Sequence, residues 1–204
     1  MSAVRAGQVS PEAAAELPGL RLFFLDAIEL DRAPDARAPR ELRARLAALA
    51  DRFRGARAIT LREEPVTGAY RRFYRQVGID PDREPTPMER AARSRIMRGG
   101  FPSQGLLADA LLAALVDTSV PVWAADAERL WGELRVAADG GRLTVADARG
   151  AVAPLFGDVG AEHAVVGATR RVVLFSLLVP GVPDVYASEA LEGCAASLLN
   201  APRR

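Results

Sequence analysis

The feature that most constrains the fold of this chain is a change in hydrophobic period near residue 119. Before that position, apolar residues recur at helical intervals, as at Tyr70, Phe73, Tyr74 and Val77, which is the spacing of one buried helical face. After it, short apolar runs separated by turn residues take over, and the longest covers residues 172–180. Helices gathered in the first half and strands in the second predict an α+β domain rather than an alternating α/β fold.

Local signals place the ends of these elements. Ser10 followed by Pro11 predicts a helix start, Thr86-Pro87 with Glu89 predicts a capping box, and Gly78 predicts a helix end. We expect helices from residue 11 and at residues 40–53, 65–77, 87–98, 106–118 and 184–199. We expect strands at residues 20–30, 58–61, 120–124, 134–138, 142–146, 151–156 and 171–179. In the helix at 87–98, the side chains of Met88, Ala92 and Ile96 are expected to be buried.

The domain organisation follows from the chain length and from the lack of a linker in the sequence. A chain of 204 residues fits one domain. No composition shift or Pro- and Gly-rich stretch is strong enough to divide it. We therefore expect residues 1–60 to pack, as an N-terminal helix and strand portion, into the same domain as a core at residues 61–204.

Hydropathy and cysteine content predict a cytoplasmic protein. No apolar run approaches the ~20 residues that a membrane helix needs, and residues 1–10 lack the apolar core of a signal peptide. The single cysteine, Cys194, excludes an internal disulfide and agrees with a reducing compartment; we interpret it as a core residue. One histidine and one cysteine offer too few ligands for a typical metal site, so neither a metal nor a cofactor is expected.

The positive charge is uneven along the chain and consists of arginine alone. Residues 1–100 carry 19 arginines against 14 acidic residues, and residues 101–204 carry 8 against 12, so the two halves have net charges of +5 and −4. Guanidinium groups suit bidentate contacts with phosphates. The candidate RNA-binding residues are Arg71, Arg72, Arg75, Arg93 and Arg95. The first three are expected on the solvent face of the helix at 65–77, and the other two, with Arg90 and Arg98, beside the buried stripe of the next helix. A GC-rich genome or a merely solvated face explains the same arginines.

Three stretches of the sequence, in this order, resemble one known family. The first is YRRFYRQVGIDP at residues 70–81, followed by the Thr86-Pro87 helix start. The second joins LLAD (106–109), VPVWAAD (120–126) and LWG (130–132). The third joins RVA (135–137), DG (139–140), VAD (145–147) and GAEH (160–163), and it ends at Thr169. In order and spacing, these stretches are similar to the B3/B4 domain of the phenylalanyl-tRNA synthetase β subunit and its freestanding relatives.

The resemblance implies both a fold and an activity. The implied fold packs helices on a mostly antiparallel, β-sandwich-like sheet arrangement. In the synthetase, this domain hydrolyses the ester of tyrosine wrongly attached to the phenylalanine tRNA. An editing pocket of this kind gains selectivity by hydrogen-bonding the extra hydroxyl group, because the correct substrate leaves its polar groups unpaired. The implied partner is the aminoacylated 3′ end of a tRNA, or an amino-acid-like ligand, and neither a membrane nor DNA is expected.

The resemblance also implies two candidate catalytic residues. Glu162 matches the glutamate that lines the family pocket, and a carboxylate accepts hydrogen bonds from a phenol or an α-ammonium group. His163 is the only histidine of the chain, so it is the sole imidazole that could act as an acid or a base near neutral pH. The alternatives are a solvated turn residue for Glu162 and a turn histidine for His163.

The candidate pocket residues are Trp123, Asp109, Asp126 and Thr169. Trp123 departs from the family pattern, which has the histidine of a His-Ala-Phe-Asp run at this position, and an indole cannot act as a base. Leu112 likewise stands where an asparagine is expected. Both departures remove polar groups that hydrolysis would use. A core tryptophan and two structural aspartates are the alternatives.

Three functions remain open at this point. The first is a deacylase that clears mischarged aminoacyl-tRNA in trans, and it rests on Glu162 and His163. The second is a non-catalytic tRNA- or RNA-binding module that uses the arginines. The third is a small-molecule, amino-acid-binding protein, which the net charge of +1 favours over a strong RNA binder. A complete tRNA ligase is not expected.

Overall fold

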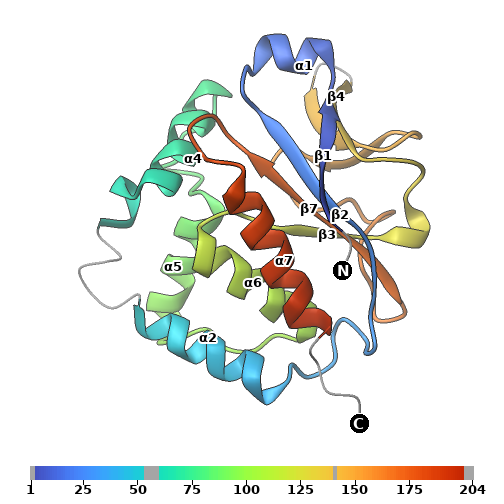
Figure 1. Cartoon of the computed structure of the whole chain (residues 1–204). Helices are drawn as coiled ribbons and strands as arrows, with labels where there is room; N and C mark the ends of the chain where they lie inside the picture. Colours follow the sequence, from blue (N-terminus) through green and yellow to red (C-terminus); the bar gives the residue numbers. More distant parts are fainter. Residues whose placement is uncertain (1–2, 53–59, 140–141, 200–204) are drawn as a thin grey trace.

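The protein combines helices with one curled mixed sheet, and the predicted α+β class is confirmed (Figure 1). The computed structural model describes residues 3–52, 60–139 and 142–199. The strands are β1 (Val4–Val9), β2 (Arg21–Glu29), β3 (Trp123–Asp126), β4 (Arg135–Asp139), β5 (Arg142–Ala146), β6 (Ala151–Pro154) and β7 (Arg171–Leu178). The helices are α1 (Pro11–Glu16), α2 (Arg40–Arg52), α4 (Pro65–Gln76), α5 (Pro87–Arg98), α6 (Leu106–Thr118) and α7 (Val185–Leu199), with short 3-10 turns η1 (Leu61–Glu63) and η2 (Ala127–Arg129).

The strands follow the order β3-β7-β2-β1-β4-β5-β6 across the sheet. Each neighbouring pair is antiparallel except β1 and β4, which run parallel. The register of β2 against β7 shifts between Leu25 and Ile28, which marks a bulge in β2. The strands form one continuous curled sheet that is mostly antiparallel, as the resemblance implies.

Strand β1 was not predicted, and its composition explains why. Its alternation is weak, because Arg5, Ala6 and Gln8 are all exposed, and a glycine inside a strand usually counts against it. Gly7 is required here by close packing: a Cβ atom at this position would stand 2.6 Å from the Cδ2 atom of Leu22 on β2. Strands β1 and β2 nevertheless occupy the middle of the sheet, so the first 30 residues contribute to its centre.

The predicted helix ends agree with the structure where capping residues mark them. Thr86 Oγ1 accepts a hydrogen bond from the backbone N–H of Glu89 (3.4 Å), and the Glu89 carboxylate accepts one from the Thr86 N–H (3.0 Å). This reciprocal pair is a capping box. Gly99 after α5 has a φ of 74°, and Gly78 after α4 has a φ of 78°. Both angles lie in the left-handed region, which glycine adopts without strain at helix ends.

Two local expectations are corrected by the structure. Of the strand expected at residues 58–61, positions 58 and 59 lie outside the described residues, and Leu61 begins the 3-10 turn η1. Ile96 was expected in the buried stripe of α5 but is 57 % exposed. Met88 and Ala92 of the same stripe are buried, so the stripe meets the core only along the first turns of the helix.

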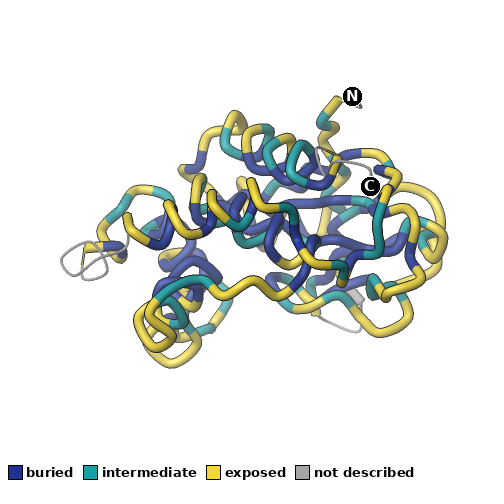
Figure 2. Tube along the Cα trace, turned by 90° about the horizontal axis from the view of Figure 1, so that it is seen from below, coloured by how far each residue is buried: buried dark blue, intermediate teal, exposed yellow. Residues whose placement is uncertain are grey.

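The hydrophobic core lies between the helices and the sheet. Helix α7 contacts β1, β2, β7 and α6, and α6 also contacts α2 and α5. In Figure 1, α7 lies in front of α6, beside the central strands. Figure 2 shows the buried segments gathered inside and the exposed ones on the outer turns. Cys194 on α7 is fully buried, as predicted, and burial raises the pKa of its thiol to about 12. In the described ranges, no helix is long and apolar enough to cross a membrane.

Candidate functional site

Three predicted site residues meet in one buried polar group, together with an aspartate that was not predicted. Asp126, at the end of β3, accepts hydrogen bonds from the Thr169 hydroxyl (2.7 Å) and from the Glu128 N–H (3.0 Å). Its own N–H donates to the carbonyl of His163 (2.9 Å). The Nε2 atom of His163 lies 3.7 Å from Oδ2 of Asp147. We call Asp126, Asp147, His163 and Thr169 the loop cluster, because they attach the connection between β6 and β7 to the ends of β3 and β5.

Asp147 is the most firmly held member of the loop cluster. It is fully buried, and its carboxylate accepts hydrogen bonds from the backbone N–H groups of Trp131 (2.8 Å), Arg149 (2.7 Å) and Gly150 (3.1 Å). Burial alone would raise the pKa of Asp147. The three backbone hydrogen bonds and the nearby His163 outweigh burial and lower the pKa below its usual value. An ionised carboxylate with this many donors holds a loop in place rather than exchanging protons.

His163 retains one property of a catalytic base. Its side chain is 13 % exposed, and its ring lies beside a buried carboxylate. A carboxylate that accepts a hydrogen bond from an imidazole fixes the orientation of the ring, as in many general bases. At 3.7 Å, the Asp147 carboxylate is near the ring but beyond hydrogen-bond distance. The backbone of His163 also belongs to the turn, since its N–H donates to the Gly160 carbonyl (2.9 Å). The backbone of His163 therefore belongs to the turn, and its partly exposed imidazole lies near the Asp147 carboxylate.

Glu162 does not join the loop cluster. Its side chain is exposed on the turn before β7, and its backbone carbonyl accepts a long hydrogen bond from the Arg129 guanidinium (3.5 Å). It is also not among the residues that line the cavity at Trp123. The two residues predicted to act together, Glu162 and His163, are thus neighbours in sequence whose side chains have different surroundings.

Trp123 lines a cavity of about 130 Å³ at the opposite end of β3 from the loop cluster. Its indole stacks on Phe175, with ring centroids 5.8 Å apart and planes 17° apart. The lining of this Trp123 cavity consists of Pro87, Arg90, Leu111, Leu112, Leu115, Pro121, Val122 and Trp123. The two departures from the family pattern, Trp123 and Leu112, therefore share one largely apolar cavity, and Arg90 is the charged residue in its described lining.

Phe156 connects α4 to the same region and was not anticipated. Its ring meets Tyr70, Phe73 and Tyr74 edge-on, with centroids 5.8, 5.6 and 5.5 Å away, and Trp123 at 6.1 Å. Its φ of 59° is left-handed, which is unusual for a bulky residue. The sequence placed this residue in an extended strand, and no local signal indicates the turn. The contacts with these aromatic rings stabilise the left-handed conformation of Phe156.

Asp109 has a structural role in the described chain. It is almost completely buried in the first turn of α6. Its carboxylate accepts hydrogen bonds from the Ser103 hydroxyl (2.5 Å) and from the Gln104 N–H (2.8 Å). It therefore closes the loop that leads into α6, and it is not one of the residues that line the Trp123 cavity.

Two of the five predicted RNA-binding arginines are used inside the protein. Arg71, expected on the solvent face of α4, is only 6 % exposed. Its guanidinium donates to Glu89 (2.5 Å) and Asp82 (2.7 Å), because α5 and the preceding loop cover that side of α4. Arg95 donates from Nε to the Ala50 carbonyl (2.9 Å), which joins α5 to the end of α2. Both side chains therefore link helices to their neighbours.

The other predicted arginines are exposed. Arg75 lies 4.0 Å from Asp82, and Arg72 and Arg93 have no carboxylate partner in the part of the chain that the structure describes. Arg90 is exposed too, and it precedes Arg93 by about one turn of α5. We call Arg90 and Arg93 the α5 arginines. Arg90 lines the Trp123 cavity, whereas Arg93 lines a separate hollow beside Leu61 and Ala92.

The described residues offer no group of three or more His, Cys, Asp and Glu side chains placed to hold a metal ion. Comparison with known proteins adds no relative, since the chain matches no protein-family model and no curated protein. The geometry of the site is therefore the basis for a functional proposal.

Proposed function

We propose that this chain is a tRNA-associated domain of the B3/B4 type that binds RNA without hydrolysing an ester. The observation that carries this proposal is a contrast within the predicted site. The Trp123 cavity has no carboxylate or imidazole in its described lining, and Glu162 lies away from it. The α5 arginines, by comparison, are exposed, and one of them lines the cavity.

This arrangement suits the end of a single-stranded RNA. Guanidinium forks bind phosphate oxygens, and the contacts depend on salt because counterions are released. The apolar cavity next to Arg90 gives an unstacked base a place to enter. Few arginines are involved, and the net charge of the chain is +1, so binding is expected to be of modest affinity.

The test compares variants that each remove two positive charges. One carries Arg90→Gln with Arg93→Gln, another carries Arg72→Gln with Arg75→Gln, and the matched control carries Arg142→Gln with Arg171→Gln. The control arginines are exposed on β5 and β7. Fluorescence anisotropy with labelled, uncharged tRNA is measured between about 50 and 200 mM salt. We expect the α5 double variant to weaken binding about tenfold and to reduce the salt slope by about 1 to 2.

The control should change the affinity by less than about twofold, since it leaves the proposed contacts intact. Equal losses in the control and in the α5 variant would show that only net charge matters and would contradict a defined interface. A parallel assay with correctly and wrongly charged tRNAs should give no hydrolysis above the protein-free rate.

A second candidate function, deacylation in trans, is favoured by one observation. His163 stands beside a buried carboxylate, as an oriented base does. Its test is the same panel of charged tRNAs with the variants Glu162→Ala and His163→Gln. Hydrolysis of a single mischarged species that either variant abolishes would replace the non-catalytic proposal with this one.

A further inference from the structure

A second basic site lies away from the predicted one, between the loop before α2 and the first turn of that helix. This hollow has a volume of about 450 Å³, and its lining includes Arg32, Arg37, Arg40 and Arg43, with Glu41 as the acidic member. Four arginines against one glutamate give the lining a formal charge of +3. We call these four arginines and the space between them the arginine hollow.

The backbone around the arginine hollow is held by α6. The carbonyls of Pro34 and Ala36 accept hydrogen bonds from the N–H groups of Leu107 (3.0 Å) and Leu106 (2.8 Å). The loop is thereby attached to the first turn of a core helix. A fixed backbone reduces the entropy that a ligand must remove on binding.

The guanidinium groups are available to different degrees. Arg43 donates from Nε to the Ala38 carbonyl (3.2 Å), which orients its guanidinium and leaves its terminal nitrogens for another partner. Arg37 and Arg40 are exposed, and no carboxylate in the described ranges pairs with either. The like charges of Arg37 and Arg40 beside one hollow repel each other unless an anion lies between them.

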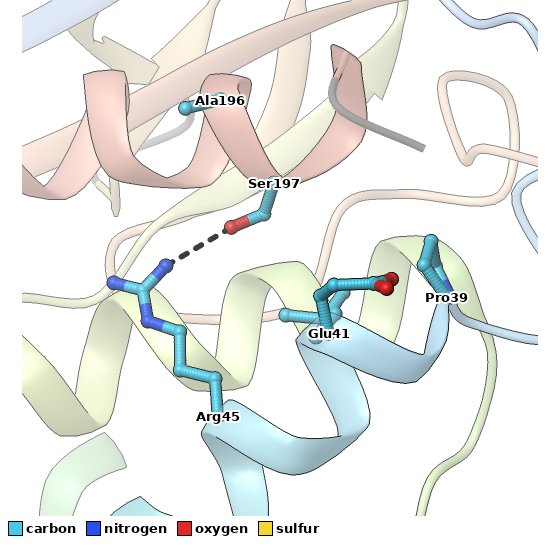
Figure 3. Close-up of a pocket in the computed structure, with 6 residues that line it drawn as sticks. Pro39, Glu41, Arg45, Ala196 and Ser197 are labelled. Carbon is cyan, nitrogen blue, oxygen red and sulfur yellow. Dashed lines mark hydrogen bonds between the residues drawn. The ribbon is translucent and has the colours of Figure 1, made fainter. Parts of the chain in front are cut away.

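The neighbouring cavity contains an arginine whose guanidinium is already paired within the protein. Figure 3 shows this cavity of about 190 Å³ between α2 and α7, where the Glu41 carboxylate lies beside Pro39. Arg45 donates there to the Ser197 hydroxyl (3.2 Å), and it also pairs with Asp117. Arg45 thus connects α2 to α7 and α6. Among the described residues, Arg37 and Arg40 have no comparable side-chain partner.

We propose that the arginine hollow binds a phosphate group. Planar guanidinium forks match phosphate oxygens in bidentate geometry, and several of them together favour a multiply charged anion over a carboxylate. The volume falls within the ordinary range of small-ligand sites. This goes beyond the RNA-binding proposal, because the residues are separate from the α5 arginines and a free phosphate compound would satisfy them as well as an RNA backbone.

The experiment uses the full chain and two probes, inorganic pyrophosphate and a single-stranded RNA oligonucleotide without a terminal phosphate. Isothermal titration calorimetry compares the wild type, the double variant Arg37→Gln with Arg40→Gln, and the charge-matched control Arg142→Gln with Arg171→Gln. Pyrophosphate binding is expected to weaken at least tenfold in the hollow variant and to stay within twofold in the control. In the wild type, the Nε–H resonances of Arg37 and Arg40 should shift on titration with pyrophosphate, which tests the site without any substitution.

The two probes separate the possible sources of the phosphate. Loss of pyrophosphate binding, with RNA binding kept, supports a site for a free phosphate compound. Loss of RNA binding in the hollow variant supports a backbone phosphate of RNA. If neither probe binds the wild type, or if the hollow variant and the control lose binding equally, the proposal is overturned. These outcomes are independent of what the α5 variants do.

Discussion

The charged residues of the loop cluster are buried and fully partnered, whereas several of those on helices α4 and α5 are exposed. In the loop cluster, Asp126 and Asp147 are buried, and each accepts several hydrogen bonds from fixed donors. On the helices, Arg90 and Arg93 are exposed and have no carboxylate partner among the described residues. A buried charge whose partners are complete is part of the fold, so of these two regions it is the helices that offer charged residues to a ligand.

The same contrast exists between two adjacent residues of α4. Arg71 is buried between Glu89 and Asp82, whereas Arg72 is exposed. For Arg71, desolvation opposes the positive charge, but the hydrogen bonds to the two carboxylates outweigh it and raise the pKa. Both arginines lie on the same broad face of α4, and Arg71 belongs to the structure because Glu89 and Asp82 cover it.

The largest expected effect comes from breaking the buried ion pair. Arg71→Met removes the guanidinium closest to the buried Glu89, which keeps its hydrogen bonds from Thr86 and a longer contact with Arg62 (3.6 Å). We expect a loss of about 3 kcal/mol of unfolding free energy, the lower end of the range for a broken buried ion pair. Arg72→Met, its neighbour on the exposed side, should change the unfolding free energy by less than about 0.5 kcal/mol. Urea unfolding of the two variants and the wild type measures both values. Similar losses of unfolding free energy in both variants would contradict a buried, ion-paired Arg71 beside an unpaired, exposed Arg72.

A second test acts on the loop cluster through pH. The pKa of Asp147 is lowered in the folded protein, so its contribution to stability is present above the unfolded pKa of about 3.9. That contribution is lost as the pH falls through the lower folded value. Asp147→Asn replaces one oxygen acceptor with an amide donor, and we expect it to cost about 1 to 3 kcal/mol at pH 7.

The measurement is urea unfolding of the wild type and of Asp147→Asn at pH 7, pH 5 and about pH 3. The difference between the unfolding free energies of the two proteins should narrow as the pH falls from 5 to about 3, because only the wild type loses an ionised carboxylate. Asp158→Asn, at an exposed position in the connection after β6, serves as the control. A difference that stays constant into acid would argue against an ionised, hydrogen-bonded Asp147.

Much of the fold could be predicted because its signals are local. The capping box at Thr86 and the glycine after α4 need only a few neighbouring residues, and both are in place. Strand β1 could not be predicted, because Gly7 makes sense only against Leu22 on another strand. The turn at Phe156 depends in the same way on aromatic rings of α4, a long way off in sequence.

The candidate site was harder to predict than the fold for the same reason. Asp126, His163 and Thr169 do come together, but the hydrogen bonds that occupy them arise from loops whose paths the sequence does not reveal. The helical period correctly places Tyr70 and Arg71 on different faces of α4. It could not show that Glu89, on the next helix, would cover the arginine. A residue's face on its helix follows from local spacing, while its availability to a ligand depends on what packs over it.

The smallest expected effect concerns two buried threonines, one of which has hydrogen-bond partners for its hydroxyl and one of which has none among the described residues. Thr86 Oγ1 accepts from the Glu89 N–H and donates to its carboxylate (2.8 Å), whereas the Oγ1 atom of Thr67 is buried without a hydrogen-bond partner among the described residues. Thr86→Val should lower the unfolding free energy by about 1 kcal/mol through loss of the cap. Thr67→Val keeps the shape and removes an unsatisfied hydroxyl, so it should be neutral or should raise the unfolding free energy by up to about 1 kcal/mol. Urea unfolding measures the sign of the change in unfolding free energy for each variant. A loss at Thr67 equal to that at Thr86 would mean that the Thr67 hydroxyl has a hydrogen-bond partner, as the polar side chains of the loop cluster do.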